Sequence, residues 1–380
     1  AAPRLTLAAD GSGTLTEAAR AAAPLVRAVP RGTDDLACIL YTSGTTGRSK
    51  GAMLSHGNLL SNARTLAEAW RFTPEDRLIH ALPIFHAHGL YVALNVTLVA
   101  GGALIFLPKF DAAEVLSLLP QATAMMGVPT FYTRLLAEPG LTREAAGAMR
   151  LFVSGSAPLL AETHREWEAR TGHRILERYG MTETSMNCSN LYDGDRRPGT
   201  VGPALPGVEV RVTEGDRVLG PEETGVLEVR GPNVFKGYWG MPEKTAEEFR
   251  EGGWFVTGDL ATIGADGWVT IVGRAKDLVI SGGYNVYPKE VEGLIDDLPG
   301  VAESAVIGLP HPDFGEGVTA VVVPRPGEAP SEGEILAALK PRLAAYKRPK
   351  RVLFVEALPR NTMGKVQKNV LRETYADLYA

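Results

Sequence analysis

Residues 41–51 read Tyr-Thr-Ser-Gly-Thr-Thr-Gly-Arg-Ser-Lys-Gly, directly after the apolar run of residues 36–40. This order predicts a strand that opens into a loop rich in hydroxyl groups and glycines. The glycines let backbone N–H groups turn inward, the hydroxyls add further donors, and Lys50 brings a positive charge. Such a loop suits a phosphate group, although its composition alone is also typical of a plain surface loop.

The phosphate loop of kinases and ATPases is the nearest alternative with a defined chemistry. That loop requires Gly-x-x-x-x-Gly-Lys followed by Ser or Thr. Here Lys50 follows Ser49 and precedes Gly51, so both the glycine before the lysine and the hydroxyl after it are missing. The sequence therefore does not match the phosphate loop of kinases and ATPases.

Further motifs follow the loop along the chain. They are Leu-Phe-Val-Ser-Gly-Ser-Ala-Pro at 151–158, Ile-Leu-Glu-Arg-Tyr-Gly-Met-Thr-Glu at 175–183, Gly-Trp-Phe-Val-Thr-Gly-Asp-Leu at 253–260, and Leu-Pro-Arg-Asn-Thr-Met-Gly-Lys-Val-Gln-Lys at 358–368. In this order the motifs resemble those of the adenylate-forming superfamily, which includes acyl-CoA synthetases, firefly luciferases and the adenylation domains of peptide synthetases. The resemblance implies binding of ATP, Mg²⁺ and coenzyme A.

The resemblance also implies roles for individual residues. The residues expected to bind ATP are Thr42, Ser43, Gly44, Thr45, Thr46, Gly47, Lys50, Gly155, Ser156, Ala157, Tyr179, Gly180, Met181, Asp259 and Arg274. Within this set Tyr179 stacks on adenine and Asp259 accepts hydrogen bonds from the ribose. Thr182 binds the α-phosphate, Glu183 holds magnesium together with Thr45, and Lys365 is the catalytic lysine.

The C-terminal part of the chain contains the residues expected for the hinge and for the coenzyme A channel. In the family, the position of Lys276 is the hinge about which a small domain rotates. Ser281, Gly282 and Gly283 then form part of the channel for coenzyme A.

Arg178 bears on the identity of the acid. Many relatives that bind uncharged acyl chains have a small residue before the tyrosine, whereas a guanidinium at this position offers paired N–H donors to a second carboxylate. Glu177 beside it offers an alternative, a structural ion pair, and the sequence leaves both open. With Met186 and Asn187 following, the stretch looks most like malonyl-CoA synthetases, which implies malonate or methylmalonate as the substrate.

Two histidines lie two residues apart at positions 86 and 88. The resemblance places His86 in the acyl pocket, and a packed neutral histidine is the alternative. A metal site is disfavoured because no third ligand follows at a suitable spacing. Arg134, on an expected helix, either extends along the helix surface or reaches the substrate pocket.

The pattern of elements predicts an α/β protein of several subdomains. Residues 1–33 read as an N-terminal linker. The resemblance implies part of an AMP-binding large domain over 34–274, with sheets flanked by helices and a small β-barrel-like subdomain, and a mobile α+β C-terminal domain over 275–380. Only residues 1–40 precede the loop, so we expect the N-terminal part of the family fold to be missing from the chain.

Composition excludes several classes of protein. The chain has 380 residues, 45% hydrophobic and 22% charged, which is typical of a globular protein. A net charge of −5 without a basic stripe disfavours nucleic-acid binding. Two cysteines support no disulfide framework and favour a cytoplasmic location, and no stretch is long enough for a membrane span.

The sequence therefore predicts an ATP-dependent acid–CoA ligase that forms an acyl-adenylate and then a thioester from a small carboxylic acid. A short-chain, medium-chain or aryl acyl-CoA synthetase, or an enzyme that loads a carrier protein, is the alternative within this chemistry. An inactive nucleotide-binding fragment is the alternative of another class.

Overall fold

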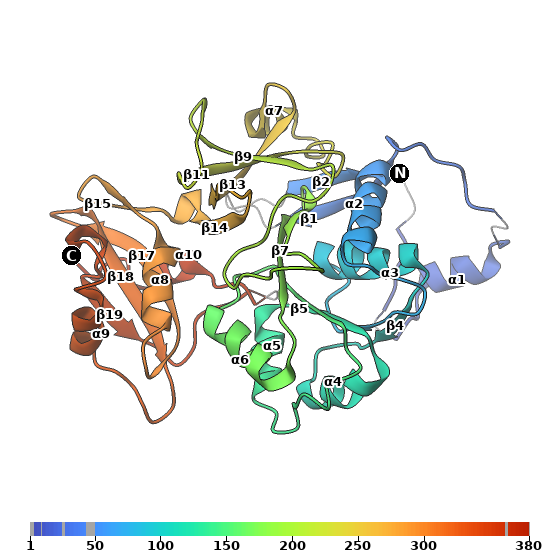
Figure 1. Cartoon of the computed structure of the whole chain (residues 1–380). Helices are drawn as coiled ribbons and strands as arrows, with labels where there is room; N and C mark the ends of the chain where they lie inside the picture. The colour runs from blue at the N-terminus through green and yellow to red at the C-terminus, as the bar shows by residue number, and fades with distance from the viewer. Residues whose placement is uncertain (1–3, 9, 25–26, 43–49, 362–363, 380) are drawn as a thin grey trace.

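The chain folds into a large lobe and a smaller C-terminal lobe that lies beside it (Figure 1). The computed structural model describes residues 4–8, 10–24, 27–42, 50–361 and 364–379. Near the N-terminus, helix α1 (Thr14–Ala21) has no buried residue, so it contributes nothing to the core.

A six-stranded, mostly parallel sheet forms the centre of the large lobe. Its strands are, in spatial order, β4 (Ala103–Phe106), β3 (Arg77–His80), β5 (Ala124–Gly127), β6 (Leu151–Ser154), β7 (Leu176–Met181) and β8 (Ser185–Ser189). The strands from β4 to β7 are parallel, and β8 is antiparallel to β7. The helices that accompany this sheet are α2 (His56–Ala69), α3 (Asn95–Ala100), α4 (Ala112–Leu118), α5 (Pro129–Leu136) and α6 (Ala161–Thr171), with a π-helix over His88–Leu94.

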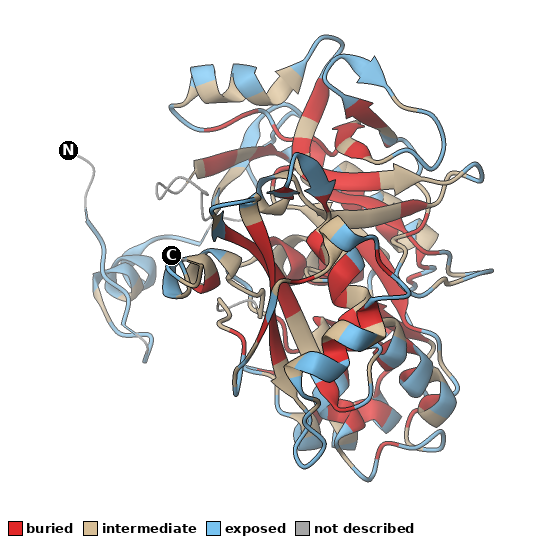
Figure 2. Cartoon of the chain, turned by 90° about the vertical axis from the view of Figure 1, so that its left-hand side faces the viewer, coloured by how far each residue is buried: buried red, intermediate tan, exposed pale blue. Residues whose placement is uncertain are grey.

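Apolar side chains cover both faces of this sheet. In β3, Leu78 packs into a core that includes Leu66 and Trp70 of the α2 side, whereas its neighbour Ile79 packs into a second core with Trp167 of α6. This alternation is what a strand buried on both faces requires. Figure 2 shows buried residues concentrated in the strands, with exposed ones on the outer helices.

Asp76 ties together the amino ends of three of these strands. Its carboxylate accepts hydrogen bonds from Nε of Arg150 at 2.7 Å, Nη2 of Arg150 at 2.6 Å and Oγ1 of Thr123 at 2.6 Å. Asp76 precedes β3, Thr123 precedes β5 and Arg150 precedes β6. The opposite, carboxyl edge of the sheet is thereby left free of this network.

A second, antiparallel sheet completes the large lobe. It contains β10 (Arg217–Val218), β9 (Glu209–Glu214), β11 (Gly225–Arg230), β13 (Trp254–Ile263) and β12 (Phe249–Arg250), with β14 (Val269–Arg274) paired to β13 and helix α7 (Pro242–Glu248) before β12. Separately, β1 (Leu36–Thr42) pairs antiparallel with β2 (Lys50–Ser55), so residues 43–49 connect two paired strands.

The C-terminal lobe is a sheet with helices and has hydrophobic cores of its own. Its strands are β16 (Tyr284–Val286), β15 (Val279–Ser281), β18 (Gly315–Pro324), β17 (Val301–His311) and β19 (Arg351–Phe354), and its helices are α8 (Pro288–Asp296), α9 (Glu332–Leu339) and α10 (Lys368–Thr374). A short 3₁₀ turn, Ala275–Asp277, leads from β14 to β15. The division at residue 275 stays a prediction.

Helix starts follow the expected capping chemistry. Ser331 and Glu334 form a reciprocal capping box at α9, and the Asp111 side chain accepts a hydrogen bond from the backbone of Glu114 at α4.

The predicted mixed α/β architecture, with several sheets flanked by helices, is confirmed. Across the described ranges, no helix has both the length and the apolar character that a membrane crossing needs.

Candidate active site

The expected site residues gather where the parallel strands end. β5 ends at Gly127, β6 at Ser154 and β7 at Met181, and parallel strands present their carboxyl ends on one edge of the sheet. Ligands of open α/β sheets bind at this edge. Ser156, two residues past β6, has a positive φ of 69°, an unusual conformation for a residue other than glycine and one found often at binding sites.

Tyr179, Asp259 and Arg274 form one cluster. Asp259 of β13 and Arg274 of β14 lie directly opposite each other in register, and Nε of Arg274 is 2.8 Å from Oδ1 of Asp259. The Tyr179 hydroxyl donates to the other oxygen, Oδ2. Burial raises the pKa of Asp259 despite the opposing charge of Arg274. Each carboxylate oxygen keeps a further lone pair, so the cluster is still able to accept hydrogen bonds from a diol.

The C-terminal motif crosses from the small lobe to the large one. A Cβ built on Gly364 would lie 3.7 Å from Oγ1 of Thr130, at the start of α5. The backbone N–H of Lys365 donates to Oδ1 of Asn361 at 3.0 Å. The loop therefore carries Lys365 to the carboxyl edge of the central sheet.

The charged side chains around Lys365 are Asp259 and Arg274 of the cluster, together with Arg178 and Glu183. Burial lowers the pKa of the Lys365 amine, and the positive charges of Arg274 and Arg178 act in the same direction. Asp259 and Glu183 oppose this effect. Lys365 therefore shares a local environment with residues from β7, β13 and β14. Its catalytic role stays a prediction.

Arg178 is the most unusual residue of the site. It is 3% exposed, and its Nε and Nη2 atoms have no hydrogen-bond partner among the described residues. Gly155 makes room for it, because a Cβ at that position would overlap the guanidinium. Burial lowers the pKa of Arg178 to about 9, so the side chain still carries its charge at neutral pH.

Glu177 does not neutralise Arg178. Successive residues of a strand point to opposite faces of the sheet, and Glu177 on β7 is directed away from Arg178. Its Oε1 lies 3.3 Å from Nδ1 of His164 and accepts a hydrogen bond from the backbone of Gly199 at 3.0 Å. The ion-pair alternative left open by the sequence is therefore wrong.

Two histidines lie beside the guanidinium. Nδ1 of His86 accepts a hydrogen bond from the backbone of His88 at 3.2 Å, and Nδ1 of His88 lies 3.2 Å from Oγ of Ser156. Burial, together with the charges of Lys365 and Arg178, lowers the pKa of His86 to about 4. No cluster of three metal-ligating side chains occurs within the described ranges, so this pair has no third ligand there.

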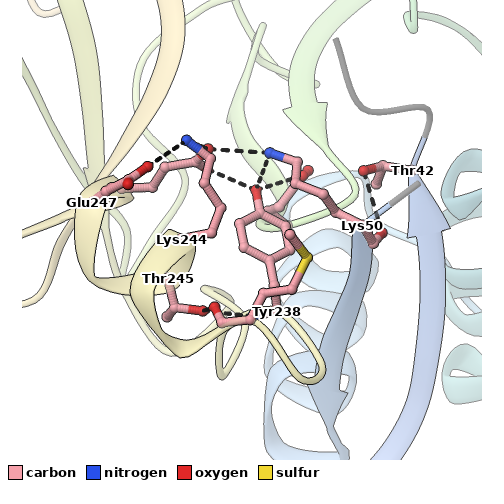
Figure 3. A network of polar contacts seen from close by, with 9 residues as sticks. Thr42, Lys50, Tyr238, Lys244, Thr245 and Glu247 are labelled. Carbon is pink, nitrogen blue, oxygen red and sulfur yellow. Dashed lines mark hydrogen bonds and ion pairs between the residues drawn. The ribbon is translucent and has the colours of Figure 1, made fainter. Parts of the chain in front are cut away.

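Glu183 belongs to a polar network that reaches Lys50, the first residue of β2. Figure 3 shows Tyr238 and Lys50 at the centre of this network. Oε1 of Glu183 accepts a hydrogen bond from the Tyr238 hydroxyl at 3.0 Å. The amine of Lys50 lies 3.1 Å from both the Tyr238 hydroxyl and Oε1 of Glu248. Lys50 is therefore engaged by a tyrosine and a carboxylate. Thr42 closes the end of the strand pair, with its hydroxyl 3.4 Å from the Lys50 carbonyl oxygen.

The family models match most of this chain. The model described as AMP-binding enzyme matches residues 2–239, and the model described as AMP-binding enzyme C-terminal domain matches residues 290–365. The chain belongs to the AMP-binding enzyme family. Its resemblance to the adenylate-forming superfamily is thereby confirmed.

Individual members of the AMP-binding enzyme family are similar over nearly the whole chain. ATP-bound MatB from Rhodopseudomonas palustris has 65% sequence identity and a TM-score of 0.96, covering 99% of this chain and 75% of that chain. Apo MatB from the same organism has the same identity and coverage but a TM-score of 0.82.

The names of two further relatives refer to two different acids, malonate and ferulate. A malonate–CoA ligase of Arabidopsis thaliana is 40% identical over 374 residues, which are 90% of this chain and 61% of the relative. A feruloyl-CoA synthase of Amycolatopsis sp is 41% identical over 353 residues, which are 91% of this chain and 71% of the relative. The chain thus spans 61–75% of the length of these family members.

Two expected residues are exposed. Arg134 lies on α5, and Lys276 lies in the turn between the lobes, where its charge acts to lower the pKa of Asp259. Ser281 ends β15, and Gly282 and Gly283 form the turn to β16 in the small lobe, where the backbone N–H of Gly282 donates to the carbonyl oxygen of Phe314 at 2.8 Å. The roles of these residues stay predictions.

The remaining expected residues are placed as follows. Ala157, Gly180, Met181 and Thr182 are partly buried near the ends of β6 and β7. A side chain at Gly180 would overlap the Ser185 carbonyl oxygen. Five of the residues expected to bind ATP lie outside the described residues, namely Ser43, Gly44, Thr45, Thr46 and Gly47.

Tyr238 and Glu248 are absent from the residues expected from the sequence. Tyr238 is 55 positions from Glu183 and 188 positions from Lys50, so neither spacing nor periodicity relates them. The one local signal is the Gly-Tyr-Trp-Gly stretch at 237–240, in which flanking glycines are typical of a chain that passes close to another backbone.

The titration of His86 tests the environment of Arg178. We expect NMR to give His86, assigned with His86→Gln, a pKa near 4, and Arg178→Met to raise that pKa because a nearby cation is removed. Since the unfolded value is near 6.5, the folded chain binds fewer protons between these limits and loses stability as the pH falls through them. The exposed His56 is the control, because its signal should not respond to the substitution. A His86 that titrates near pH 6.5 in the wild type would contradict this account.

Proposed function

We propose that this chain acts as an ATP-dependent acid–CoA ligase whose acid is malonate or a close relative such as methylmalonate. The observation that carries the proposal is the buried guanidinium of Arg178, which lacks an internal anion among the described residues and lies near Lys365. The ATP named for the MatB structure and the malonate named for the Arabidopsis relative support the same activity.

A dicarboxylate suits this site for a physical reason. A buried charge costs free energy unless it is paired and hydrogen-bonded, and a guanidinium pairs best with a planar carboxylate that takes two N–H donors. Malonate has one carboxylate to place against Arg178 and a second, one carbon away, to react. A monocarboxylate would leave Arg178 unpaired.

The nucleotide would lie against the cluster of Tyr179, Asp259 and Arg274. Asp259 would accept hydrogen bonds from the ribose hydroxyls, and Tyr179 would cover the adenine ring. Mg²⁺ commonly binds one or two carboxylates together with substrate phosphates, so Glu183 fits as its protein ligand, with Thr45 as a further candidate. The ion would offset negative charge on the phosphates.

Adenylation joins two anions, so the protein must offset charge. A carboxylate oxygen of malonate attacks the α-phosphorus of ATP, a P–O bond forms, and pyrophosphate leaves with the electron pair of the broken bond. The ammonium of Lys365 and the hydroxyl of Thr182 would stabilise the charge that develops on the phosphoryl oxygens. The carboxylate that attacks is itself the nucleophile, so the reaction requires no nucleophilic side chain.

The second half-reaction would require another arrangement of the lobes. This chain matches ATP-bound MatB better than apo MatB at equal identity, which supports an arrangement suited to adenylation. Lys365 then lies at the large lobe, while the turn at 281–283 lies away from it. We infer that rotation about Lys276 withdraws Lys365 and brings that turn over the acyl carbonyl, where the coenzyme A thiol attacks.

A pyrophosphate-release assay separates the candidate activities. Release with malonate far above acetate, butyrate or ferulate is expected, and higher release with ferulate would favour an aryl acyl-CoA synthetase like the Amycolatopsis relative. Equal use of free coenzyme A and a carrier protein's pantetheine would favour the carrier-loading alternative. No release with any acid would indicate a nucleotide-binding fragment.

We also propose a cytoplasmic location. Cys38 and Cys188 are both free thiols, and unpaired cysteines persist in a reducing compartment.

Replacing Arg178 tests the choice of acid. We expect Arg178→Met to lower kcat/KM for malonate by the equivalent of about 2–4 kcal/mol, because a buried charge pair is lost, with little loss for butyrate. Pyrophosphate release measured with both acids gives the comparison. An equal loss for both acids would assign Arg178 a structural role.

Replacing Lys365 tests the two arrangements of the lobes. Lys365→Ala should abolish formation of the adenylate, because the mobile ammonium is lost, yet it should leave thioester formation from preformed malonyl-adenylate largely intact. The two half-reactions are measured separately, by pyrophosphate release and by consumption of the coenzyme A thiol. If both half-reactions fell equally, rotation of the small lobe would be the wrong explanation.

A further inference from the structure

The Tyr238 hydroxyl is the meeting point of three charged side chains (Figure 3). It lies 3.0 Å from Oε1 of Glu183, 2.7 Å from Oε2 of Glu248 and 3.1 Å from the amine of Lys50. The Lys50 amine also lies 4.3 Å from the centre of the Tyr238 ring. A single hydroxyl thus links the expected magnesium ligand to the strand that follows residues 43–49.

The position of Tyr238 is held by its own backbone. Tyr238 forms an antiparallel bridge with Ala52 of β2, and its N–H donates to Oγ1 of Thr245 at 2.9 Å. On either side, the Met53 N–H donates to Gly237 and the Trp239 N–H donates to Gly51, at 2.9 and 2.8 Å. The segment therefore runs as an added strand beside β2, so the ring cannot shift without disturbing that strand.

A lysine ammonium only donates, so Lys50 donates to the Tyr238 oxygen. The single hydroxyl hydrogen of Tyr238 is then shared between Oε2 of Glu248 at 2.7 Å and Oε1 of Glu183 at 3.0 Å. Glu248 has two other donors, Lys50 at 3.1 Å and Lys244 at 3.0 Å. Burial acts to raise the pKa of Glu248, but hydrogen bonds from Tyr238 and these lysines outweigh it and lower that pKa.

Among the described residues, the Glu183 carboxylate has fewer side-chain hydrogen-bond donors besides Tyr238 than the Glu248 carboxylate has. Glu183 is 5% exposed, and within the described part of the chain the Tyr238 hydroxyl is the one side-chain hydrogen-bond donor to its carboxylate. If the hydroxyl were removed, Glu248 and Lys50 would keep each other, whereas Glu183, within the described ranges, would keep only its backbone hydrogen bond and lose its side-chain donor.

We propose that Tyr238 is a positioning residue, whose hydroxyl orients the Glu183 carboxylate for a divalent cation and couples it to β2 at the end of the phosphate loop. This inference rests on the proposed function, because it takes Glu183 as the ligand of the magnesium that accompanies ATP. Residues that orient a metal ligand in this way affect metal affinity without touching the metal.

Tyr238→Phe tests the inference through ATP binding, measured by calorimetry with Mg²⁺ and again with EDTA. We expect the variant to weaken binding of ATP in Mg²⁺ by about tenfold to a hundredfold, as typical for the loss of a partner of a metal ligand. Binding of ATP in EDTA, and of AMP, should stay within about twofold, because those ligands do not use the carboxylate-bound cation. The Mg²⁺ concentration for half-maximal pyrophosphate release should rise, with an unchanged KM for malonate.

Thr245→Ala is the matched control. It removes the hydroxyl that fixes the Tyr238 backbone and donates to Met241, but it leaves the contact of Tyr238 with Glu183 in place. We expect a lower melting temperature with unchanged dependence on Mg²⁺. A change in Mg²⁺ dependence equal to that of Tyr238→Phe would overturn the inference, because general loosening of the loop would explain both.

A double-substitution cycle with Glu183→Gln provides the second test. Tyr238→Phe should cause no further loss of Mg²⁺-dependent binding when Glu183 is already replaced, whereas additive losses would overturn the inference. Equal weakening of ATP binding in Mg²⁺ and EDTA would overturn it as well. If the wild type binds no ATP, the proposed function fails and this inference with it, whereas an intact wild-type response with an unchanged variant overturns this inference alone.

Discussion

A charged guanidinium enclosed by protein is the feature on which the rest of the site depends. Arg178 is almost fully buried, and two of its nitrogen atoms lack partners among the described residues. Burial of an unpaired charge is unfavourable, so such an arrangement is retained where an anion is to be bound. Gly155 leaves space for the guanidinium, and the alternation of β7 turns Glu177 to the other face.

The positive charges around Arg178 also favour binding of an anion. Arg178, Arg274 and Lys365 approach one another from β7, β14 and the C-terminal loop, with Asp259 and Glu183 offsetting part of their charge. The charges of Arg274 and Arg178 both act to lower the pKa of the Lys365 amine, so an anion that enters the cluster stabilises the ammonium. A dicarboxylate and a triphosphate are suitable partners, and both react only when positive groups reduce their mutual repulsion.

Motif and order are enough to predict the fold class and which residues come together in the cluster of Tyr179, Asp259 and Arg274. Tyr179, Asp259 and Lys365 are far apart in the chain, yet each lies within a motif specific enough to be assigned from the amino-acid sequence. The partner of Arg178 stays open at that level, because a sequence does not say which face of β7 lines a pocket. Tyr238 escapes prediction because its contacts with Glu183 and Lys50 arise only when β2 and the segment before α7 come together. The glycines at 237 and 240 indicate a close approach of two backbones, but they do not identify Glu183 and Lys50 as the partners of Tyr238.

The most direct test of the unpaired guanidinium is the free energy of unfolding of the wild type and Arg178→Met in urea, each with and without malonate. Without malonate, the Met variant should be the more stable of the two, because a buried charge with no partner is removed. Malonate should raise the stability of the wild type by mass action and leave the variant unchanged. A Met variant that is less stable without malonate, and gains as much from it as the wild type, would contradict the account, because Arg178 would then be satisfied within the protein.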